Sequence, residues 1–222
     1  MAKLLVIDTE TGGLDAQIHS VLSLGAVVWE DGKLLDEIEL FIEELPMMVT
    51  LAALRVSKIE LLKMENAMSP NQAVSRLSDF LARNFGAVPP QRRIELAGHN
   101  VSFDVGFLQR LYRLAGIDRS AFEKLFSHRL MDTSMMFRFL IFAGRLADQK
   151  ASLSDCLNCF QIQYDSKSRH SALQDARYTA SLLSKLLEMV PSAVSLPERD
   201  ASSIEGFSSP SGTVINFDSR RL

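Results

Sequence analysis

Two acidic residues end the first strongly apolar segment of the chain. The segment reads LLVIDTETGG, Leu4 to Gly13, and its acids are Asp8 and Glu10. Residues two apart in a β-strand face the same side, so both carboxylates would point together from the end of a buried strand. Open α/β sheets commonly place their sites at the carboxyl ends of strands. The two acids therefore either lie in a turn exposed to solvent or form a binding site for a positively charged group.

A second polar cluster lies in AGHNVSFDVGFL, Ala97–Leu108. His99 and Asn100 follow a short apolar strand, and Ser102 is the expected N-cap of the next helix. Asp104 then falls in the first helical turn, where the helix dipole stabilises a negative charge. That local effect explains Asp104 by itself, whereas packing does not explain the His-Asn dipeptide.

A third cluster lies in SRHSALQDARYTASLL, Ser168–Leu183. Ser171 and Gln174 have the spacing of a capping box, which predicts a helix from about residue 172. Asp175 is then in the first turn and His170 lies just before the helix. Residues five apart on one helix diverge by about 140°. His170 can therefore approach Asp175 only from the preceding loop.

These clusters share one chemical requirement. Four carboxylates, those of Asp8, Glu10, Asp104 and Asp175, would repel one another if they were packed together without a cation. Hard divalent ions such as Mg²⁺ or Mn²⁺ prefer oxygen ligands and also bind substrate phosphates. Two such ions about 3.5–4 Å apart can activate water and stabilise the leaving oxygen of a phosphodiester. His170 is suited to accept the proton of that water.

The apolar pattern supplies elements that could position these residues. The expected strands are Leu4–Asp8, Val21–Glu30, Lys33–Glu44, Ile94–Gly98 and Leu130–Asp132, with a hairpin turn at Asp31-Gly32. The expected helices are Leu51–Met64, Pro70–Phe85, Phe103–Ala115, Thr133–Ala143, Leu153–Phe160 and Ala172–Met189. Strands joined by hairpins, followed by strands separated by helices, predict an α/β fold with a mixed sheet.

Composition narrows the class of protein. The chain has 222 residues, is 47% hydrophobic and carries a net charge of −3. It has no apolar run of the roughly 20 residues that a membrane span needs, so we expect a cytoplasmic protein without membrane contact. The net negative charge argues against a broad basic surface for binding nucleic acid, but it permits local binding of one strand end. Cys156 and Cys159 fit two small helix residues better than a redox or zinc pair, because no second Cys/His pair follows.

The chain divides into two parts by composition. Residues 1–190 carry the clusters and the expected elements, and we interpret them as one domain. The rest, Pro191–Leu222, includes ASSIEGFSSPSG and is interpreted as a flexible or loosely docked extension. Its apolar TVINF segment could pack against the domain or bind a partner.

The segments DTETGG, HNVSFDVGFL and HSALQDA resemble the three exonuclease motifs of the DEDDh, or DnaQ-like, family of 3′–5′ exonucleases. That family includes polymerase proofreading subunits, ribonuclease T and oligoribonuclease. The resemblance spans residues 4 to about 189. It implies a ribonuclease H-like fold, with a mixed five-stranded sheet flanked by helices, and two Mg²⁺ or Mn²⁺ ions. Asp132-Thr133 is similar to a recurring family feature with an expected structural role.

The resemblance also assigns roles to residues. Asp8, Glu10 and Asp175 would hold the first ion, with Asp8 bridging to a second. Asp104 would act on the second ion, partly through water. His170 would be the general base, because its spacing to Asp175 is that of the histidine subclass. The residues expected to bind the terminal nucleotide are Thr11, Gly12, Leu14, His99, Asn100 and Phe103.

The expected activity is metal-dependent hydrolysis from the 3′ end of single-stranded or frayed DNA, releasing nucleoside 5′-monophosphates. The alternative is the same chemistry on RNA, as in ribonuclease T or oligoribonuclease. A third reading is a polymerase-associated subunit tethered by its C-terminal extension. A metal-binding domain without nuclease activity would require the placement of His170 and Asp104 to be coincidental. A homodimer is a further expectation, because several free-standing relatives are dimers.

Overall fold

A computed structural model describes residues 3–57, 67–86, 90, 92–165 and 171–190. The strands are β1 (Leu4–Thr11), β2 (Val21–Glu30), β3 (Lys33–Phe41), β4 (Ile94–Gly98) and β5 (Phe126–Asp132). The helices are α1 (Leu51–Ser57), α2 (Pro70–Phe85), α3 (Val101–Leu114), α4 (Arg119–Leu125), α5 (Thr133–Phe142), α6 (Leu153–Cys159) and α7 (Ala172–Glu188). His170, the extension from Pro191 and the second half of the helix predicted at Leu51–Met64 lie outside the described residues.

The five strands form one mixed sheet in the order β3-β2-β1-β4-β5. β2 pairs antiparallel with both β1 and β3, whereas β4 pairs parallel with both β1 and β5. This confirms the predicted mixed five-stranded sheet. The hairpin between β2 and β3 turns at Asp31 and Gly32, whose φ angles of 51° and 82° are those of a tight hairpin turn.

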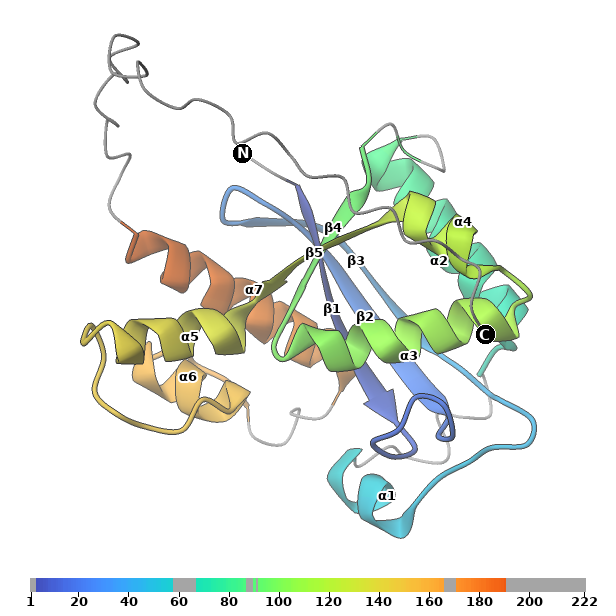
Figure 1. The fold of residues 1–222 in the computed structure, drawn as a ribbon, viewed down its shortest axis with the longest axis horizontal. Helices are drawn as coiled ribbons and strands as arrows, with labels where there is room; N and C mark the ends of the chain where they lie inside the picture. The colour runs from blue at the N-terminus through green and yellow to red at the C-terminus, as the bar shows by residue number, and fades with distance from the viewer. Residues whose placement is uncertain (1–2, 58–66, 87–89, 91, 166–170, 191–222) are drawn as a thin grey trace, which may run out of the picture. The chain divides into compact units, whose positions relative to one another are not determined.

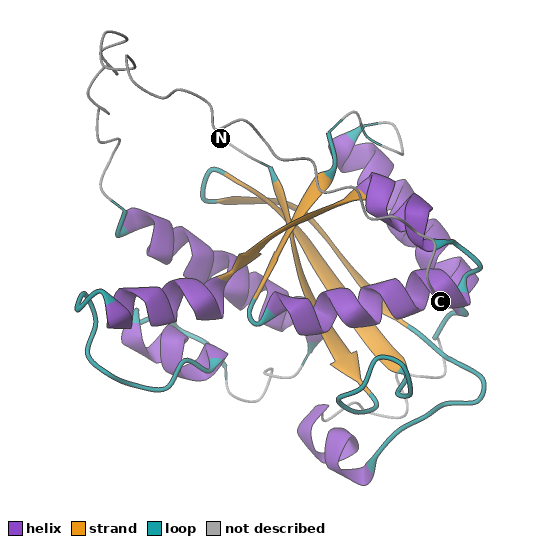
Figure 2. Cartoon of the chain, viewed as in Figure 1, coloured by secondary structure: helices purple, strands orange, loops and turns teal. Residues whose placement is uncertain are grey.

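Helices cover both faces of the sheet (Figures 1 and 2). Alternation along the central strand β1 sends Leu5 and Ile7 into a core shared with α2 and α3, on one face. Leu4 and Val6 point to the other face, where they pack with Ala176 and other residues of α7. The side that each β1 residue faces therefore decides whether it meets α3 or α7.

A smaller core joins α5, α6 and α7. Phe137, Leu157 and Leu182 are fully buried there, one from each helix. Cys156 belongs to the same core and burial raises the pKa of its thiol to about 12, while Cys159 is half-buried. Both cysteines are free and lie on α6. No helix among the described residues is long and apolar enough to cross a membrane.

Several element boundaries differ from the prediction. α4 was not predicted; its signal is Asp118, whose carboxylate accepts a hydrogen bond from the Ala121 N–H at 2.9 Å. β5 begins at Phe126, four residues before the predicted strand. β3 ends at Phe41 instead of Glu44, and α3 begins at Val101 instead of residue 103.

Candidate active site

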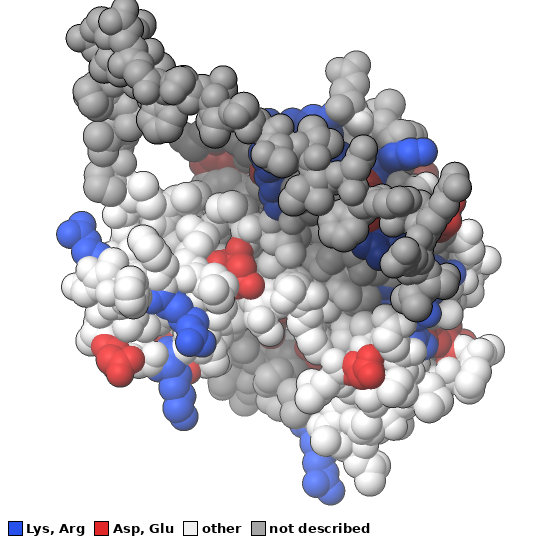
Figure 3. All heavy atoms as spheres, in the orientation of Figure 1, with Lys and Arg blue, Asp and Glu red and all other residues white. Residues whose placement is uncertain are grey.

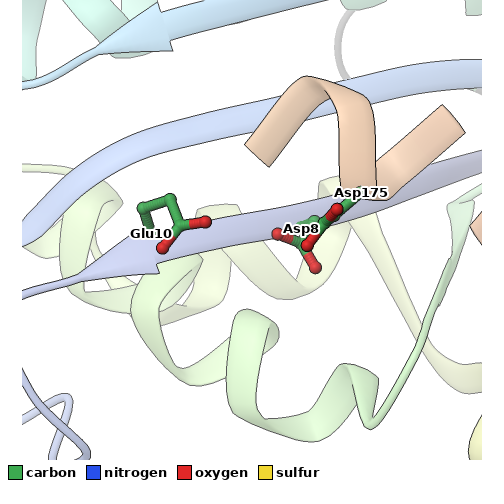
Figure 4. Close-up of side chains that lie close together, drawn as sticks. All are labelled: Asp8, Glu10 and Asp175. Carbon is green, nitrogen blue, oxygen red and sulfur yellow. The ribbon is translucent and has the colours of Figure 1, made fainter. Parts of the chain in front are cut away.

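Three of the four predicted acids converge at the end of β1. Carboxylate oxygens of Asp8, Glu10 and Asp175 all lie within 4.8 Å of one another. Glu10 and Asp175 are only 9% and 6% exposed. Figure 4 shows Asp8 and Glu10 on the same strand, with Asp175 reaching Asp8 from the first turn of α7. The two-residue spacing on β1 thus places both of its acids on the face that α7 covers.

A glycine on β2 lets α7 approach this closely. Gly25 pairs directly with Asp8 in the sheet. A Cβ atom at Gly25 would lie 2.2 Å from both the Ala172 carbonyl carbon and the Leu173 amide nitrogen. Only a residue without a side chain fits between β2 and the start of α7. Gly25 therefore fixes the distance between Asp8 and Asp175.

The start of α7 differs from the prediction in its cap. The helix begins at Ala172, as predicted, but the Ser171 side chain makes no capping hydrogen bond to the helix. The Ser171 hydroxyl instead donates to Glu39 Oε1 on β3 at 2.9 Å. The predicted Ser171–Gln174 capping box is therefore wrong, because the side chain ties the helix to the sheet edge instead.

Asp104 does not belong to the three-carboxylate cluster. It sits in the first turn of α3, and its Oδ1 accepts hydrogen bonds from the Thr9 N–H at 2.9 Å and the Thr9 hydroxyl at 2.7 Å. Thr9 lies between the two β1 acids and faces the opposite side of the strand. Asp104 therefore approaches β1 from the α3 face, and its Oδ1 is held by Thr9.

Burial opposes the ionisation of Asp104 in the absence of metal. The side chain is 4% exposed, and this burial raises its pKa to about 7, against the opposing effect of the Thr9 hydrogen bonds. The charge of Asp132 also raises this pKa. A nearby cation would reverse the balance and favour the carboxylate.

The loop that begins α3 is tied to α5. Asp132 caps α5 by accepting from the Ser134 N–H at 2.9 Å, and it also accepts from the N–H groups of Asn100 and Val101. Asn100, not the predicted Ser102, is the N-cap of α3, and its φ of 64° is left-handed. Asp132 therefore holds the beginnings of two helices together, consistent with its expected structural role.

Both ring nitrogens of His99 lie against protein groups. Nε2 lies 2.9 Å from the Ala151 carbonyl oxygen, so it carries the hydrogen and donates. Nδ1 lies 3.0 Å from the Thr133 hydroxyl. His99 thus fixes the segment before α6 against α5, and its contact with a nucleotide stays a prediction.

A cavity of about 620 Å³ opens beside Glu10. It is lined by Thr9, Glu10, Thr11, Gly13, Leu14, His19, Thr50, Ala52, Ala53 and Phe103. Thr11, Leu14 and Phe103 were predicted to bind the terminal nucleotide, and the structure brings them together here. Gly12, His99 and Asn100 are not among the described residues that line it. The Leu14 side chain is 87% exposed, so it forms an open lip.

Sequence reasoning missed the α1 side of this cavity and His19. Thr50, Ala52 and Ala53 come from the start of α1, a segment without any distinctive motif. The His19 ring lies against Gly13 and its Nδ1 is 3.2 Å from the Asp15 N–H. The available signal was the position of His19 directly before β2, opposite the acidic end of β1.

A buried ion pair supports the loop that forms the lip. Arg110 on α3 lies 2.7 Å from Glu44, and the two side chains are 10% and 4% exposed. Arg110 also donates to the carbonyl oxygens of Ala16 and Gln17 in the loop. Glu44 accepts from the Val21 N–H at 2.9 Å. No sequence pattern predicted this pair, because its members are 66 residues apart.

The donor set suits a hard divalent cation. Three carboxylates from two rigid elements can offer oxygens at the 2.0–2.6 Å that Mg²⁺ and Ca²⁺ require. No soft ligand belongs to this group, so copper or a thiolate zinc site is not the chemistry that the described residues offer. His170 lies outside the described residues, and its role stays a prediction.

Comparison with known proteins agrees with this geometry. A family model described as "RNase_T: Exonuclease" matches residues 5–183. The chain belongs to the RNase_T exonuclease family. The match includes α3, nearly all of β1 and the first turns of α7, and therefore all the acids of the site. With its DTETGG, HNVSFDVGFL and HSALQDA motifs, the chain is a DEDDh-type member of this family.

Relatives within the family carry two different names. Over 185 residues the chain is 28% identical to ribonuclease T of Haemophilus influenzae, with 80% of this chain and 76% of the relative covered. Over 187 residues it is 25% identical to DNA polymerase III PolC-type of Bacillus cereus, with 84% of this chain covered. The match spans only 11% of that polymerase's length.

Solved structures confirm the fold of this RNase_T member. E. coli ExoI, in a zinc-bound complex with single-stranded DNA, has a TM-score of 0.70 at 14% identity and covers 86% of this chain and 42% of its own. The nuclease domain of 3′hExo, a DEDDh family member bound to rAMP, has a TM-score of 0.66 at 14% identity, with coverages of 84% and 92%. The sheet order and flanking helices are thus those of the ribonuclease H-like DEDDh exonucleases.

Proposed function

We propose that this protein hydrolyses the terminal phosphodiester at the 3′ end of DNA, in single strands or frayed ends, and releases nucleoside 5′-monophosphates. The observation that carries the proposal is the cluster of Asp8, Glu10 and Asp175, whose oxygens lie within 4.8 Å beside an open cavity. Family membership supports the reaction type. The cavity supplies a place for the last nucleotide next to the acids.

Each acid has a distinct proposed role. Asp8, Glu10 and Asp175 would hold one Mg²⁺ or Mn²⁺ ion, and Asp8 would bridge to a second, on which Asp104 would act partly through water. When bound, two such ions supply the positive charge that activates water and stabilises the leaving oxygen. His170 would accept the proton of the attacking water. Thr9 would keep Asp104 oriented through its two hydrogen bonds.

The cavity lining suits a nucleotide. Leu14 and Phe103 offer apolar surface against which a base could stack, and Phe103 is itself supported by Phe107 at a ring distance of 4.9 Å. Thr11 and Thr50 offer polar groups at the same opening. Of the remaining predicted contacts, Gly12, His99 and Asn100 would act through backbone or ring faces near the same end of the sheet.

The second candidate substrate is RNA. It is favoured by the similarity to ribonuclease T, which covers more of the relative's length than the similarity to the polymerase does. A homodimer and a contact with a polymerase remain predictions. Light scattering and co-purification with and without residues 191–222 would test them.

The deciding experiment compares matched 5′-labelled DNA and RNA oligonucleotides, single-stranded and duplex, with Mg²⁺ or Mn²⁺. We expect a ladder that shortens from the 3′ end, with the higher rate on single-stranded DNA. Asp8→Asn and His170→Ala should abolish it. Asp79→Asn, an exposed acid on α2, is the matched control and should retain the wild-type rate. An absence of products with either metal would refute the proposal, and a faster rate on RNA would change the substrate.

A further inference from the structure

The outward face of α5 is apolar and unusually exposed. Met135, Phe139 and Phe142 are 64%, 65% and 89% exposed, and their spacing of four and three residues places them on one side of the helix. The opposite side, with Thr133 and Phe137, is buried. A surface helix normally presents polar residues to water, so this stripe requires a reason other than folding.

The charged side chains closest to the stripe on α5 are basic. Arg138 lies between the exposed apolar residues, and Arg145 follows the end of the helix; both are exposed. Residues 133–147 contain these two arginines and no acidic residue. Figure 3 shows basic side chains and uncharged surface over α5 and α6, with a few acidic groups among them. The face combines aromatic rings with positive charge, whereas the whole chain has a net charge of −3.

The stripe lies on a helix whose first turn is tied to the beginning of α3, the helix that carries Asp104. Asp132 accepts from the Ser134 N–H in the first turn of α5 and from the N–H groups of Asn100 and Val101, about one helical turn before Asp104. From Met135 to Phe142 the helix rises about 10 Å at 1.5 Å per residue. That length corresponds to about three stacked nucleotides at about 3.4 Å each.

We propose that Met135, Phe139 and Phe142, with Arg138 and Arg145, form a platform for the single strand upstream of the scissile bond. The inference rests on the proposed function, since it places more of the same substrate. Bases stack on Phe139 and Phe142, and the two arginines neutralise the passing phosphates. The binding is independent of sequence, because every base has an aromatic face.

The charge pattern favours nucleic acid over a second copy of the chain. A two-fold interface through this face would bring the same patch of both copies together, and with it Arg138 close to its own counterpart. A polyanionic strand meets no such repulsion.

The test measures binding apart from catalysis. Fluorescence anisotropy of 5′-fluorescein dT12 and dT3 with the full chain in chelator reports the platform without hydrolysis. Phe139→Ala/Phe142→Ala should weaken dT12 binding at least tenfold and leave dT3 within twofold. Arg138→Ala/Arg145→Ala should lower the slope of log Kd against log salt by about 0.7 for each lost phosphate contact. Leu34→Ala/Leu35→Ala, on the edge strand β3 and about half exposed, is the control and should bind like the wild type.

A hydrolysis assay with a short and a long substrate distinguishes failure of the platform from failure of the proposed function. The p-nitrophenyl ester of thymidine 5′-monophosphate needs only the catalytic centre, so the Phe139→Ala/Phe142→Ala protein should cleave it at the wild-type rate while its KM for dT12 rises at least tenfold. Unchanged dT12 affinity and KM would overturn the platform even if the enzyme is active. A wild-type dimer that this double variant converts to a monomer would also overturn it, by assigning the face to a second copy. An inactive wild type would refute the proposed function and leave the anisotropy result intact.

Discussion

Replacing Gly25 with alanine tests how the site is assembled. The new Cβ would lie 2.2 Å from backbone atoms of Ala172 and Leu173, whereas ordinary van der Waals contact begins at 3.4 Å. Relief of the clash therefore requires β2 and the start of α7 to separate by about 1.2 Å. Both neighbours are backbone atoms, so no side-chain rotation can absorb the change. Asp175 moves with its helix, while Asp8 stays with the sheet.

The expected loss is larger in activity than in stability. Overpacking of this size typically costs about 1–3 kcal/mol of unfolding free energy. A displacement of about 1 Å at a reacting centre can lower the rate about 100-fold. We therefore expect Gly25→Ala to lower kcat/KM on a labelled oligonucleotide about 100-fold, and to weaken Mn²⁺ binding measured by calorimetry, at a temperature where circular dichroism shows the variant folded.

Gly106→Ala is the matched control for this substitution. Gly106 lies within α3, and a Cβ there would meet only Ala16 Cβ at an ordinary 3.6 Å. Alanine is the better helix former by about 1 kcal/mol, so this variant should be as stable as the wild type or more stable. Its activity should be unchanged. If Gly25→Ala keeps wild-type Mn²⁺ affinity and activity within threefold, the reasoning about helix placement is wrong.

Three further predictions concern buried polar groups. Asp104→Asn should stabilise the metal-free protein above pH 7. The pKa of Asp104 is about 7 in the folded protein and 3.8 ordinarily, so the unfolding free energy of the wild type falls by at most about 4 kcal/mol as the pH rises between these values. Equal pH profiles of urea unfolding in chelator for the two proteins would contradict this. Arg110→Met should lower the unfolding free energy by about 3–5 kcal/mol, because it leaves the buried Glu44 carboxylate without its ion-pair partner. The Arg110→Met/Glu44→Gln protein should recover most of this loss. If it does not, the loss does not come from the buried charge. Tyr112→Phe should leave the unfolding free energy unchanged or raise it by about 1 kcal/mol, because the Tyr112 hydroxyl is buried without a hydrogen-bond partner among the described residues. Thermal unfolding measures this, and a clear loss of stability would reveal a hydrogen bond to that hydroxyl.

The sequence predicted the site best where the repeat of a single strand or helix determines which way a side chain faces. The two-residue repeat of β1 correctly placed Asp8 and Glu10 on one side, and helix-start signals placed Asp175 in the first turn of α7. The same repeat also implied that Thr9 faces the other way. Its partnership with Asp104 could not be predicted, because the sequence does not state which helix covers which face of the sheet.

Contacts between distant segments were the least predictable part. The Arg110–Glu44 pair joins α3 to the chain after β3, and neither residue lies in a motif. The close approach of Gly25 to α7 depends on the docking of one whole helix. Ser171 illustrates the same limit: its spacing to Gln174 suits a local cap, but Glu39 on a neighbouring strand accepts its hydrogen bond instead. Tertiary contacts of this kind override local preferences because they are set by packing.

Rigid and irregular segments contribute different parts of the site. The acids lie on the central strand and on the first turns of two helices, where packing on both faces of the sheet holds them in place. The cavity lip comes instead from the loop before β2 and from the start of α1, where Leu14 is largely exposed. Substitutions in the lip can change which nucleotide fits without moving the acids, because surface loops tolerate change better than the core does. Discrimination between DNA and RNA is therefore expected to depend on the lip and on the upstream strand, while the hydrolytic chemistry depends on the sheet.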